Sequence, residues 1–308
     1  MSRSPVDLQN RDRRWLKDGR GQGRRELYKR WLNIQDLTKA GKGQRRQQGT
    51  LVRPQGRVVQ REYHLASHLE SKVFDLFDNL DVTPWNIEVL DILEQFPLLS
   101  TQGADVEPAG DTIAIARELG VPHIPANHSD SPTVMTTDLV VKIRTSNRQQ
   151  PIVLALAIKP AADLSDPTRR DRILEKLEIE MAYWERHQFD GLSVRWFLVT
   201  NEQIPDDLIT NLHLLGAFKH LADPKLPSPA DLAFIRRTCL EAASPDFPLS
   251  RLARQLDQQL RLPQGQAIDA IYHLIARLEL PIDLFKPLRP DQPLVLLDVA
   301  VEAEHVFS

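Results

Sequence analysis

Two apolar runs joined by a short polar break most constrain how this chain folds. They read MTTDLVVKIR (135–144) and PIVLALAIKP (151–160), with polar residues 145–150 between them. Runs rich in β-branched residues on either side of a polar break are typical of the two strands of a hairpin. Period-2 alternation in the first run predicts one face with Thr137, Leu139, Val141 and Ile143, and another with Thr136, Asp138 and Val140.

Each of these runs carries a charged side chain, Asp138 in the first and Lys159 in the second. Burying a charge without a partner is costly, so the two side chains need each other, a metal ion or water. Taken alone, an Asp–Lys pair across two strands is most often a structural ion pair. The same arrangement is also typical of a divalent-metal nuclease site.

Hydrophobic periodicity predicts further elements around the hairpin. Apolar residues at three- and four-residue spacing predict a helix over 64–80, with Glu70 beside its apolar stripe. A helical Glu usually lies on a solvated face. We also predict a strand at 85–99, a helix at 112–120, a helix at 170–187 and a strand at 192–200. The helix at 170–187 is expected to bury Leu174, Leu177, Met181 and Trp184.

The order of these elements predicts an α/β fold, a mixed sheet with flanking helices. After residue 203 the chain becomes helical, with helices predicted at 206–221, 229–244, 248–260 and 263–280. Two short strands joined by a Pro-rich turn are expected within 281–299, which together with the last two helices is a winged-helix pattern. Cys239 lies in an apolar helical stretch and is expected to pack in the core.

The C-terminal helices do not have the charge of a DNA-binding surface. The outward residues predicted for the helix at 265–279 are Gln266, Asp269, His273 and Arg277. Residues 204–308 carry 10 basic and 14 acidic residues. Docking of a protein is therefore a better interpretation of this region than DNA binding.

Basic residues are concentrated at the N-terminus. Residues 1–61 hold 17 Lys and Arg against 5 Asp and Glu, whereas residues 62–308 hold 22 against 37. A basic segment interleaved with aromatic residues favours binding to phosphate backbones, although a solvated tail or a patch for an acidic partner has the same composition. The candidate DNA-contacting residues are Arg20, Arg24, Arg25, Lys29, Arg30, Lys42, Arg45 and Arg46.

Length and composition narrow the class of protein. A chain of 308 residues favours two domains. One cysteine excludes disulfides within the chain and a thiolate zinc site, which fits a reducing compartment. The sequence has no 18-residue apolar run and no signal-peptide pattern, so we expect a cytoplasmic protein without a membrane partner.

Several motifs resemble the TnsA family, the endonuclease subunit of a two-subunit cut-and-paste DNA transposase. VMTTDLVV (134–141), IKPAADLSD (158–166) and EKLEIEMAYWE (175–185) carry the resemblance in the hairpin and the following helix. GRGQGRRELYKRWL (19–32), HLASHLESKVF (64–74), LEQFPLL (93–99) and ELGVPHIP (118–125) match upstream in the same order. The resemblance covers roughly residues 19–203.

This resemblance implies a restriction-endonuclease-like fold and a catalytic set of Glu70, Asp138 and Lys159. Glu70 and Asp138, with the backbone carbonyl of Ile158, would hold Mg²⁺, for which Mn²⁺ would substitute. Lys159 would steer the attacking water and offset charge at the phosphate. The chain departs from the family at two positions: Leu93 stands where the family usually has Arg, and Ala157 stands where it has a polar residue.

The resemblance also implies an organisation and partners. We expect a DNA-binding arm at 1–61, a catalytic domain at 62–203 and a partner-docking domain at 204–308. The partners would be double-stranded transposon-end DNA, a TnsB-type transposase that cuts the 3′ ends, and a TnsC-type AAA+ regulator bound by the C-terminal domain. This chain would cut the 5′ ends.

An alternative is a catalytically weak or inactive assembly subunit that bridges end DNA and the regulator. Ala157 is the best support for that alternative, because its methyl group coordinates nothing. A free-standing restriction or repair nuclease is disfavoured by the match of motifs and by the docking-like second domain.

Overall fold

The computed structural model describes residues 52–60, 63–100, 109–123, 134–219, 226–241 and 247–297. The chain divides into two compact units: unit 1 is Met1–Phe74 with Leu90–Gln203, and unit 2 is Asp75–Val89 with Ile204–Ser308. No helix in the described ranges has the length and apolar character needed to span a membrane. The candidate DNA-contacting residues lie outside the described residues: Arg20, Arg24, Arg25, Lys29, Arg30, Lys42, Arg45 and Arg46.

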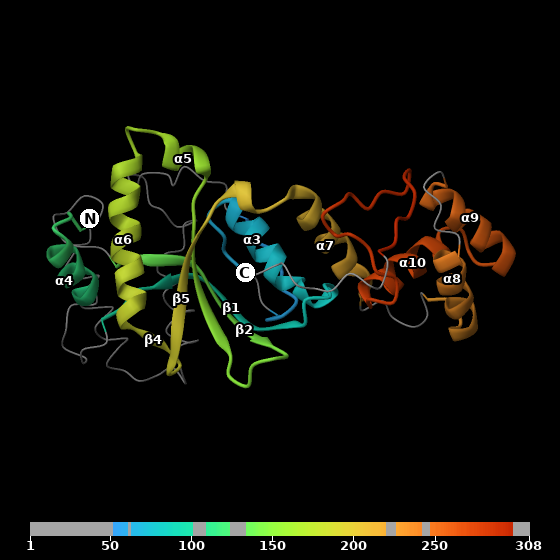
Figure 1. Ribbon diagram of the computed structural model, residues 1–308, viewed down its shortest axis with the longest axis horizontal. Helices are drawn as coiled ribbons and strands as arrows, with labels where there is room; N and C mark the ends of the chain where they lie inside the picture. Colours follow the sequence, from blue (N-terminus) through green and yellow to red (C-terminus); the bar gives the residue numbers. More distant parts are fainter. Residues whose placement is uncertain are drawn as a thin grey trace, which may run out of the picture. The chain divides into compact units, whose positions relative to one another are not determined.

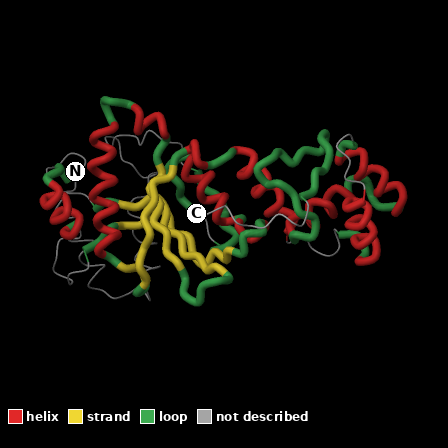
Figure 2. The backbone as a smooth tube through the Cα atoms, in the orientation of Figure 1, coloured by secondary structure: helices red, strands yellow, loops and turns green. Residues whose placement is uncertain are grey.

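Unit 1 is built on a mixed sheet whose described strands run in the order β1-β2-β3-β5-β4 (Figures 1 and 2). Strands β2 and β3 form the predicted antiparallel hairpin, and β3 runs parallel to β5. The fold is therefore α/β, as expected, and the mixed sheet is consistent with a nuclease-like fold. The strands are β1 (Ile87–Pro97), β2 (Thr136–Thr145), β3 (Ile152–Ile158), β4 (Gln188–Phe189) and β5 (Leu192–Val199).

Helices cover both faces of this sheet. In Figure 1, α6 lies on one side of the strands and α3 on the other, and α4 packs against α6. The short helix α5 lies between β3 and α6 in the chain. The helices of unit 1 are α3 (His68–Asp78), α4 (Gly110–Leu119), α5 (Ala161–Ser165) and α6 (Arg170–Arg186).

Helix α3 begins four residues later than the apolar spacing predicted. Leu65 lies before the helix and exchanges two backbone hydrogen bonds with Val52, at 2.9 and 3.0 Å. The Ser67 hydroxyl then accepts the backbone N–H of Glu70 at 3.1 Å, as a residue at the start of a helix does. Pairing with residue 52 therefore competes with helix formation up to Ser67.

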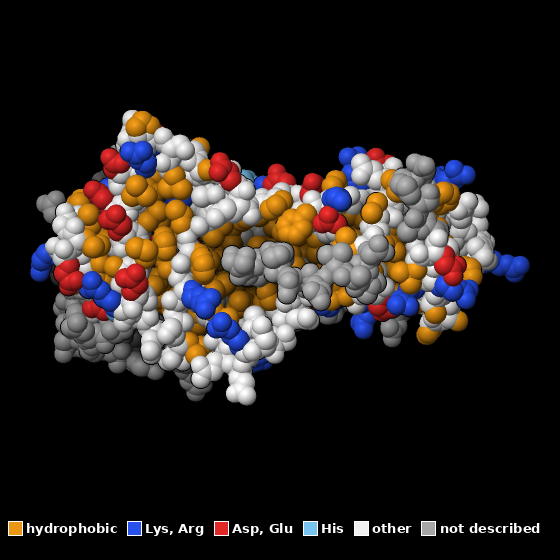
Figure 3. Space-filling view, in the orientation of Figure 1, with side chains coloured by type: hydrophobic (Ala, Val, Ile, Leu, Met, Phe, Trp, Pro, Cys, Tyr) orange, Lys and Arg blue, Asp and Glu red, His pale blue; other side chains and the backbone are white. Residues whose placement is uncertain are grey.

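The buried face of α6 differs from the predicted stripe. Leu177 and Trp184 are buried as expected, but Leu174 and Met181 are 40% and 39% exposed, so that part of the prediction was wrong. In Figure 3 apolar side chains are visible at the surface on the α6 and β5 side of unit 1. Glu180 is buried in their place, because neighbouring side chains supply it with hydrogen bonds. Glu180 was not part of the predicted buried stripe.

Unit 2 is helical, and each of the four predicted helices is present. Its core contains Leu212, Leu215, Ile235, Leu249 and Ile271. Cys239 is buried in this core, as predicted, and burial raises the pKa of its thiol to about 12. The helices are α7 (Asp206–Lys219), α8 (Pro229–Glu241), α9 (Leu249–Leu260) and α10 (Gln266–Ala276), with the short η2 (Leu80–Val82) beside α7.

Two expectations for unit 2 were wrong. His273, expected on the outer face of α10, is buried, and its Nδ1 donates to the carbonyl of Phe218 at 2.8 Å. Within 281–297 the structure has single antiparallel bridges, Ile282 with Leu296 and Pro293 with Pro248, in place of two strands. The winged-helix arrangement therefore stays a prediction.

Candidate active site

Asp138 and Lys159 meet where strands β2 and β3 part. The β2–β3 register ends with Leu139 opposite Leu156. Beyond it, the Asp138 side chain replaces the strand as acceptor, because its Oδ2 accepts the backbone N–H of Ile158 at 2.7 Å. Lys159 Nζ donates to the same oxygen at 2.6 Å and to the carbonyl of Ile158 at 3.0 Å. The two charges predicted within the hairpin are therefore in contact, in a partly exposed pair.

Glu70 reaches the site from the first turn of α3. Its carboxylate accepts the backbone N–H of Ala66 at 2.9 Å and the hydroxyl of Ser67 at 3.1 Å. Ser67 in turn accepts the Glu70 N–H, so the Ser-x-x-Glu spacing acts much as a capping box does. Glu70 is only 5% exposed, which is unusual for a carboxylate that forms no salt bridge with any described residue.

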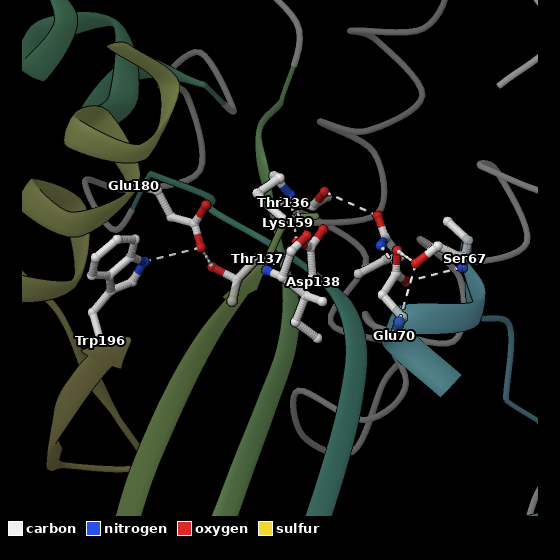
Figure 4. Close-up of polar contacts among 11 residues, drawn as sticks. Ser67, Glu70, Thr136, Thr137, Asp138, Lys159, Glu180 and Trp196 are labelled. Carbon is white, nitrogen blue, oxygen red and sulfur yellow. Dashed lines mark hydrogen bonds and ion pairs between the residues drawn. The ribbon is translucent and has the colours of Figure 1, made fainter. Parts of the chain in front are cut away.

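Electrostatics link Glu70 to the Asp138–Lys159 pair. Burial, and secondly the charge of Asp138, raise the pKa of Glu70 to about 7, while Lys159 acts to lower it. Burial acts to lower the pKa of Lys159, but the charge and hydrogen bond of Asp138 outweigh it and the pKa is raised. No hydrogen bond joins Glu70 to either partner, yet all three groups share one electrostatic environment. Figure 4 shows the three side chains at one end of the sheet.

The predicted faces of β2 are wrong near Asp138. Strict alternation would put Thr137 and Val140 on opposite faces. Instead, Val140 belongs to the core cluster that includes Ile179 of α6, and Thr137 also bonds to α6. The pairing of β2 with β3 begins at Leu139, so the alternation set by that ladder does not extend to Thr137.

A buried network on the α6 side was not found from the sequence. Thr137 Oγ1 donates to Glu180 Oε1 at 2.8 Å, and Trp196 Nε1 donates to the same oxygen at 3.2 Å (Figure 4). Trp184 Nε1 donates to Thr137 Oγ1 at 2.8 Å. Burial, and secondly the charge of Asp138, raise the pKa of Glu180 to about 7. The sequence did contain one indication of this network: Trp184 and Trp196 lie in apolar stretches, and a buried indole N–H needs an acceptor.

Gln95 of β1 is a second residue that the sequence did not single out. Its Nε2 donates to Glu70 Oε2 at 3.3 Å, and its Oε1 accepts the hydroxyl of Thr136 at 3.2 Å. Gln95 thus connects α3 to the strand that carries Asp138. The signal was present as the Glu-Gln pair of the LEQFPLL motif, in which Gln95 follows the buried Glu94.

Comparison with known proteins identifies the family to which this arrangement belongs. Residues 86–201 match the family described as TnsA-like endonuclease N terminal, and residues 203–284 match TnsA endonuclease C terminal. The chain is 30% identical over 281 residues to transposon Tn7 transposition protein TnsA of Escherichia coli, which covers 91% of this chain and 88% of that protein. The chain belongs to the TnsA endonuclease family. It is accordingly a DNA endonuclease, a subunit of a transposase, and Asp138 and Lys159 lie within the first matched region.

Membership of an endonuclease family suggests a divalent-metal requirement, and the donor set of this TnsA-family chain fits one. Asp138 Oδ2 and the Ile158 carbonyl already converge on one cationic atom, the ammonium of Lys159, which stands in for an ion. Among the described residues, no group of three or more His, Cys, Asp and Glu is placed to hold a metal. Two carboxylates and a carbonyl nevertheless suit Mg²⁺, which prefers oxygen ligands and keeps several waters. Ala157 is fully buried and supplies no ligand.

Proposed function

We propose that this endonuclease hydrolyses phosphodiester bonds at the 5′ ends of a mobile element in a Mg²⁺-dependent reaction. Glu70 and Asp138, with the carbonyl of Ile158, would hold the ion, and Mn²⁺ would substitute for it. The observation that carries the proposal is the contact between Lys159 and Asp138 at the end of the hairpin, with the buried Glu70 in the same electrostatic field. Two carboxylates close to a lysine are expected where a protein binds both a cation and a phosphate group.

The residues of the chain have distinct tasks in this reaction. A bound Mg²⁺ would lower the pKa of its water and stabilise the attacking and leaving oxygens. Lys159 exchanges its contact with Asp138 for the phosphate, where its ammonium orients the attacking water and offsets developing charge. Unit charges about 4 Å apart interact by about 1 kcal/mol in water and about 4 kcal/mol in a partly dehydrated site. The Lys159 side chain is 30% exposed, so a DNA strand that covers it would strengthen its effect.

The wider assignments follow the family and the charge distribution. We propose that residues 1–61 form a DNA-binding arm, that 62–203 form the catalytic domain and that 204–308 dock the partner. The relative from Escherichia coli is a transposition protein, which supports a TnsB-type transposase and a TnsC-type AAA+ regulator as partners of this chain. The acidic excess of 204–308 favours a protein rather than DNA as the ligand of the C-terminal domain.

One observation favours a second candidate, an assembly subunit with weak cleavage. Ala157, two residues before Lys159, places a methyl group where the family has a polar side chain. With one side-chain ligand fewer, the ion would be held less tightly. The same experiment distinguishes the two candidates.

The test reconstitutes cleavage from the purified chain, its cognate transposase and regulator, and end DNA in Mg²⁺, with nicks mapped on both strands. We expect the parent chain to give 5′-end cuts and Asp138→Ala to abolish them while the 3′ cuts persist. Asp190→Ala is the matched control, because Asp190 pairs with Lys142 at 3.3 Å in the same unit, outside the site. If Asp138→Ala leaves the 5′ cuts unchanged, the catalytic assignment is wrong. A parent that assembles on DNA without cutting supports the assembly subunit.

A further inference from the structure

Gln95 has an unusual backbone for a residue within a strand. Its φ is 48°, in the left-handed region that residues with a side chain rarely adopt, and it is flanked by residues of β1 on both sides. Glycine adopts this conformation without a steric cost, whereas glutamine does not. A strained residue is retained only where its surroundings impose the conformation, and such residues concentrate at functional sites.

The conformation lets two consecutive side chains serve the same segment. In a regular strand, successive side chains point to opposite faces. Here a carboxylate oxygen of Glu94 accepts the backbone N–H of His64 at 3.2 Å, and Gln95 Nε2 donates to Glu70 at 3.3 Å. Both partners lie within 64–70, which comprises the residues just before α3 and its first turn. The left-handed turn therefore directs Gln95 toward the site rather than away from it.

Within the described part of the chain, Gln95 is the one residue of the sheet that donates a hydrogen bond to the Glu70 carboxylate. The other hydrogen bonds to this carboxylate come from Ala66 and Ser67, at the start of the same helix. Through its Oε1, Gln95 also accepts the hydroxyl of Thr136, two residues before Asp138 on β2. The side chain thus spans from the one carboxylate to the strand that carries the other.

A hydrogen bond from β1 is needed because the two carboxylates repel each other and Ala157 of β3 has no side-chain donor. The charge of Asp138 acts on Glu70 unfavourably. On β3, Ala157 stands two residues before Lys159 and has no polar side-chain atom that could hydrogen-bond either carboxylate. Support for Glu70 therefore comes from β1.

We propose that Gln95 is a positioning residue, which holds the Glu70 carboxylate at the distance from Asp138 that a divalent cation requires. This inference rests on the proposed metal site. It explains how the site functions with alanine at position 157, and why a strained glutamine occurs in β1. Residues that hold a metal ligand in place typically contribute 10- to 100-fold to metal affinity.

The test measures Mn²⁺ affinity of the full-length chain by titration calorimetry, together with the midpoint of thermal unfolding. Gln95→Met keeps the size of the side chain but removes both hydrogen bonds, and we expect Mn²⁺ to bind about 10- to 100-fold more weakly. Gln95→Gly relieves the backbone strain, so the midpoint is expected to stay or rise while Mn²⁺ affinity falls. A merely structural role predicts that affinity and midpoint change together.

Asp190→Gly is the matched control, because Asp190 has φ 51° and lies in the same unit outside the site. It should leave the Mn²⁺ affinity unchanged. If the parent binds Mn²⁺ through Asp138 and Gln95→Met binds it equally tightly, the positioning role is overturned and the metal site stands. If the parent binds no Mn²⁺ that Asp138→Ala removes, the metal site and this inference are overturned together.

Discussion

Lys159 has two possible tasks, and the position of its ammonium separates them. An ordinary cross-strand ion pair would need only the carboxylate of Asp138. Lys159 Nζ also donates to the Ile158 carbonyl, so it occupies both of the oxygens of the hairpin that we assign to the metal. The lysine and an ion therefore compete for the same atoms. In the proposed reaction, an ion bound by these two oxygens would displace the ammonium, and we expect Lys159 to contact the phosphate instead.

Removal of the lysine is expected to separate metal binding from cleavage. In Lys159→Met, two oxygens are released and a repelling positive charge is lost, so we expect Mn²⁺ to bind at least about tenfold more tightly. Cleavage of end DNA should be lost, because nothing then orients the water or offsets the phosphate charge. Titration calorimetry and nick mapping on the same preparation make the two measurements.

Lys142→Met is the control for the lysine substitution, since Lys142 pairs with Asp190 at 3.3 Å outside the site. It should change neither quantity. Mn²⁺ affinity that falls in Lys159→Met would show that the ammonium does not occupy the metal position.

At the scale of elements, α6 is attached to the sheet through a buried carboxylate. Glu180 accepts hydrogen bonds from Thr137 of β2 and Trp196 of β5, and it lies 5% exposed. Thr137 immediately precedes Asp138, so the network also fixes the end of β2 where the site forms. Burial, and secondly the charge of Asp138, favour the protonated state of this carboxylate and so raise its pKa.

Glu180 gives the apo chain a defined dependence of stability on pH. The pKa rises from 4.5 to about 7 on folding, so between these values the folded state binds more protons than the unfolded state. The contribution of Glu180 to the free energy of unfolding is therefore lost as pH rises through this window. Glu180→Gln keeps an acceptor oxygen and cannot ionise. We expect the free energy of unfolding of this variant to rise relative to that of the parent as pH increases from 4 to 8, by about 3 kcal/mol at most.

Urea unfolding of the parent and Glu180→Gln at several pH values measures this difference. Glu178→Gln is the control, because Glu178 is exposed on the same helix. A difference between Glu180→Gln and the parent that stays constant from pH 4 to pH 8 would contradict the prediction.

Elements with strong hydrophobic periodicity, or with a residue that marks their end, were predictable from the sequence. The hairpin followed from its two apolar runs, and helix α4 ends at Gly120, whose φ of 70° suits glycine. Asp138 and Lys159 were recognisable as charges inside apolar strands. The role of Glu70 came from the resemblance alone, because nothing in the local sequence distinguishes it from other glutamates that lie beside the apolar face of a helix.

The remaining features depend on contacts that no local pattern encodes. Glu180 is buried because Thr137 of β2 and Trp196 of β5 donate to it, and periodicity alone predicted only the Leu177 and Trp184 part of the buried face of α6. Gln95 reaches the site through a left-handed turn within a strand, which alternation excludes. His273 is buried for a similar reason, since the Phe218 carbonyl of another helix accepts a hydrogen bond from its ring.

At the scale of the whole molecule, charge is divided unequally along the chain. Residues 1–61 have a net charge of +12 and residues 62–308 a net charge of −15, from 17 basic against 5 acidic and 22 against 37. An acidic body repels the DNA backbone, whereas a basic segment releases counterions from it. The N-terminal segment is therefore expected to supply most of the non-specific affinity for DNA. Residues 52–54 pair with 63–65, so a truncation that spares them keeps this part of the fold.

Deletion of residues 1–50 tests this division, because it removes 14 basic and 5 acidic residues and leaves Val52 paired with Leu65. We expect weaker binding to duplex DNA and a flatter dependence of affinity on salt. The log–log slope should fall by about 0.9 for each phosphate contact that is lost. Fluorescence anisotropy on a labelled duplex between low and physiological salt measures the slope. If the truncated chain binds DNA with the same salt slope as the parent, the phosphate contacts lie outside residues 1–50. A smaller slope together with an unchanged unfolding midpoint assigns these contacts to the deleted segment.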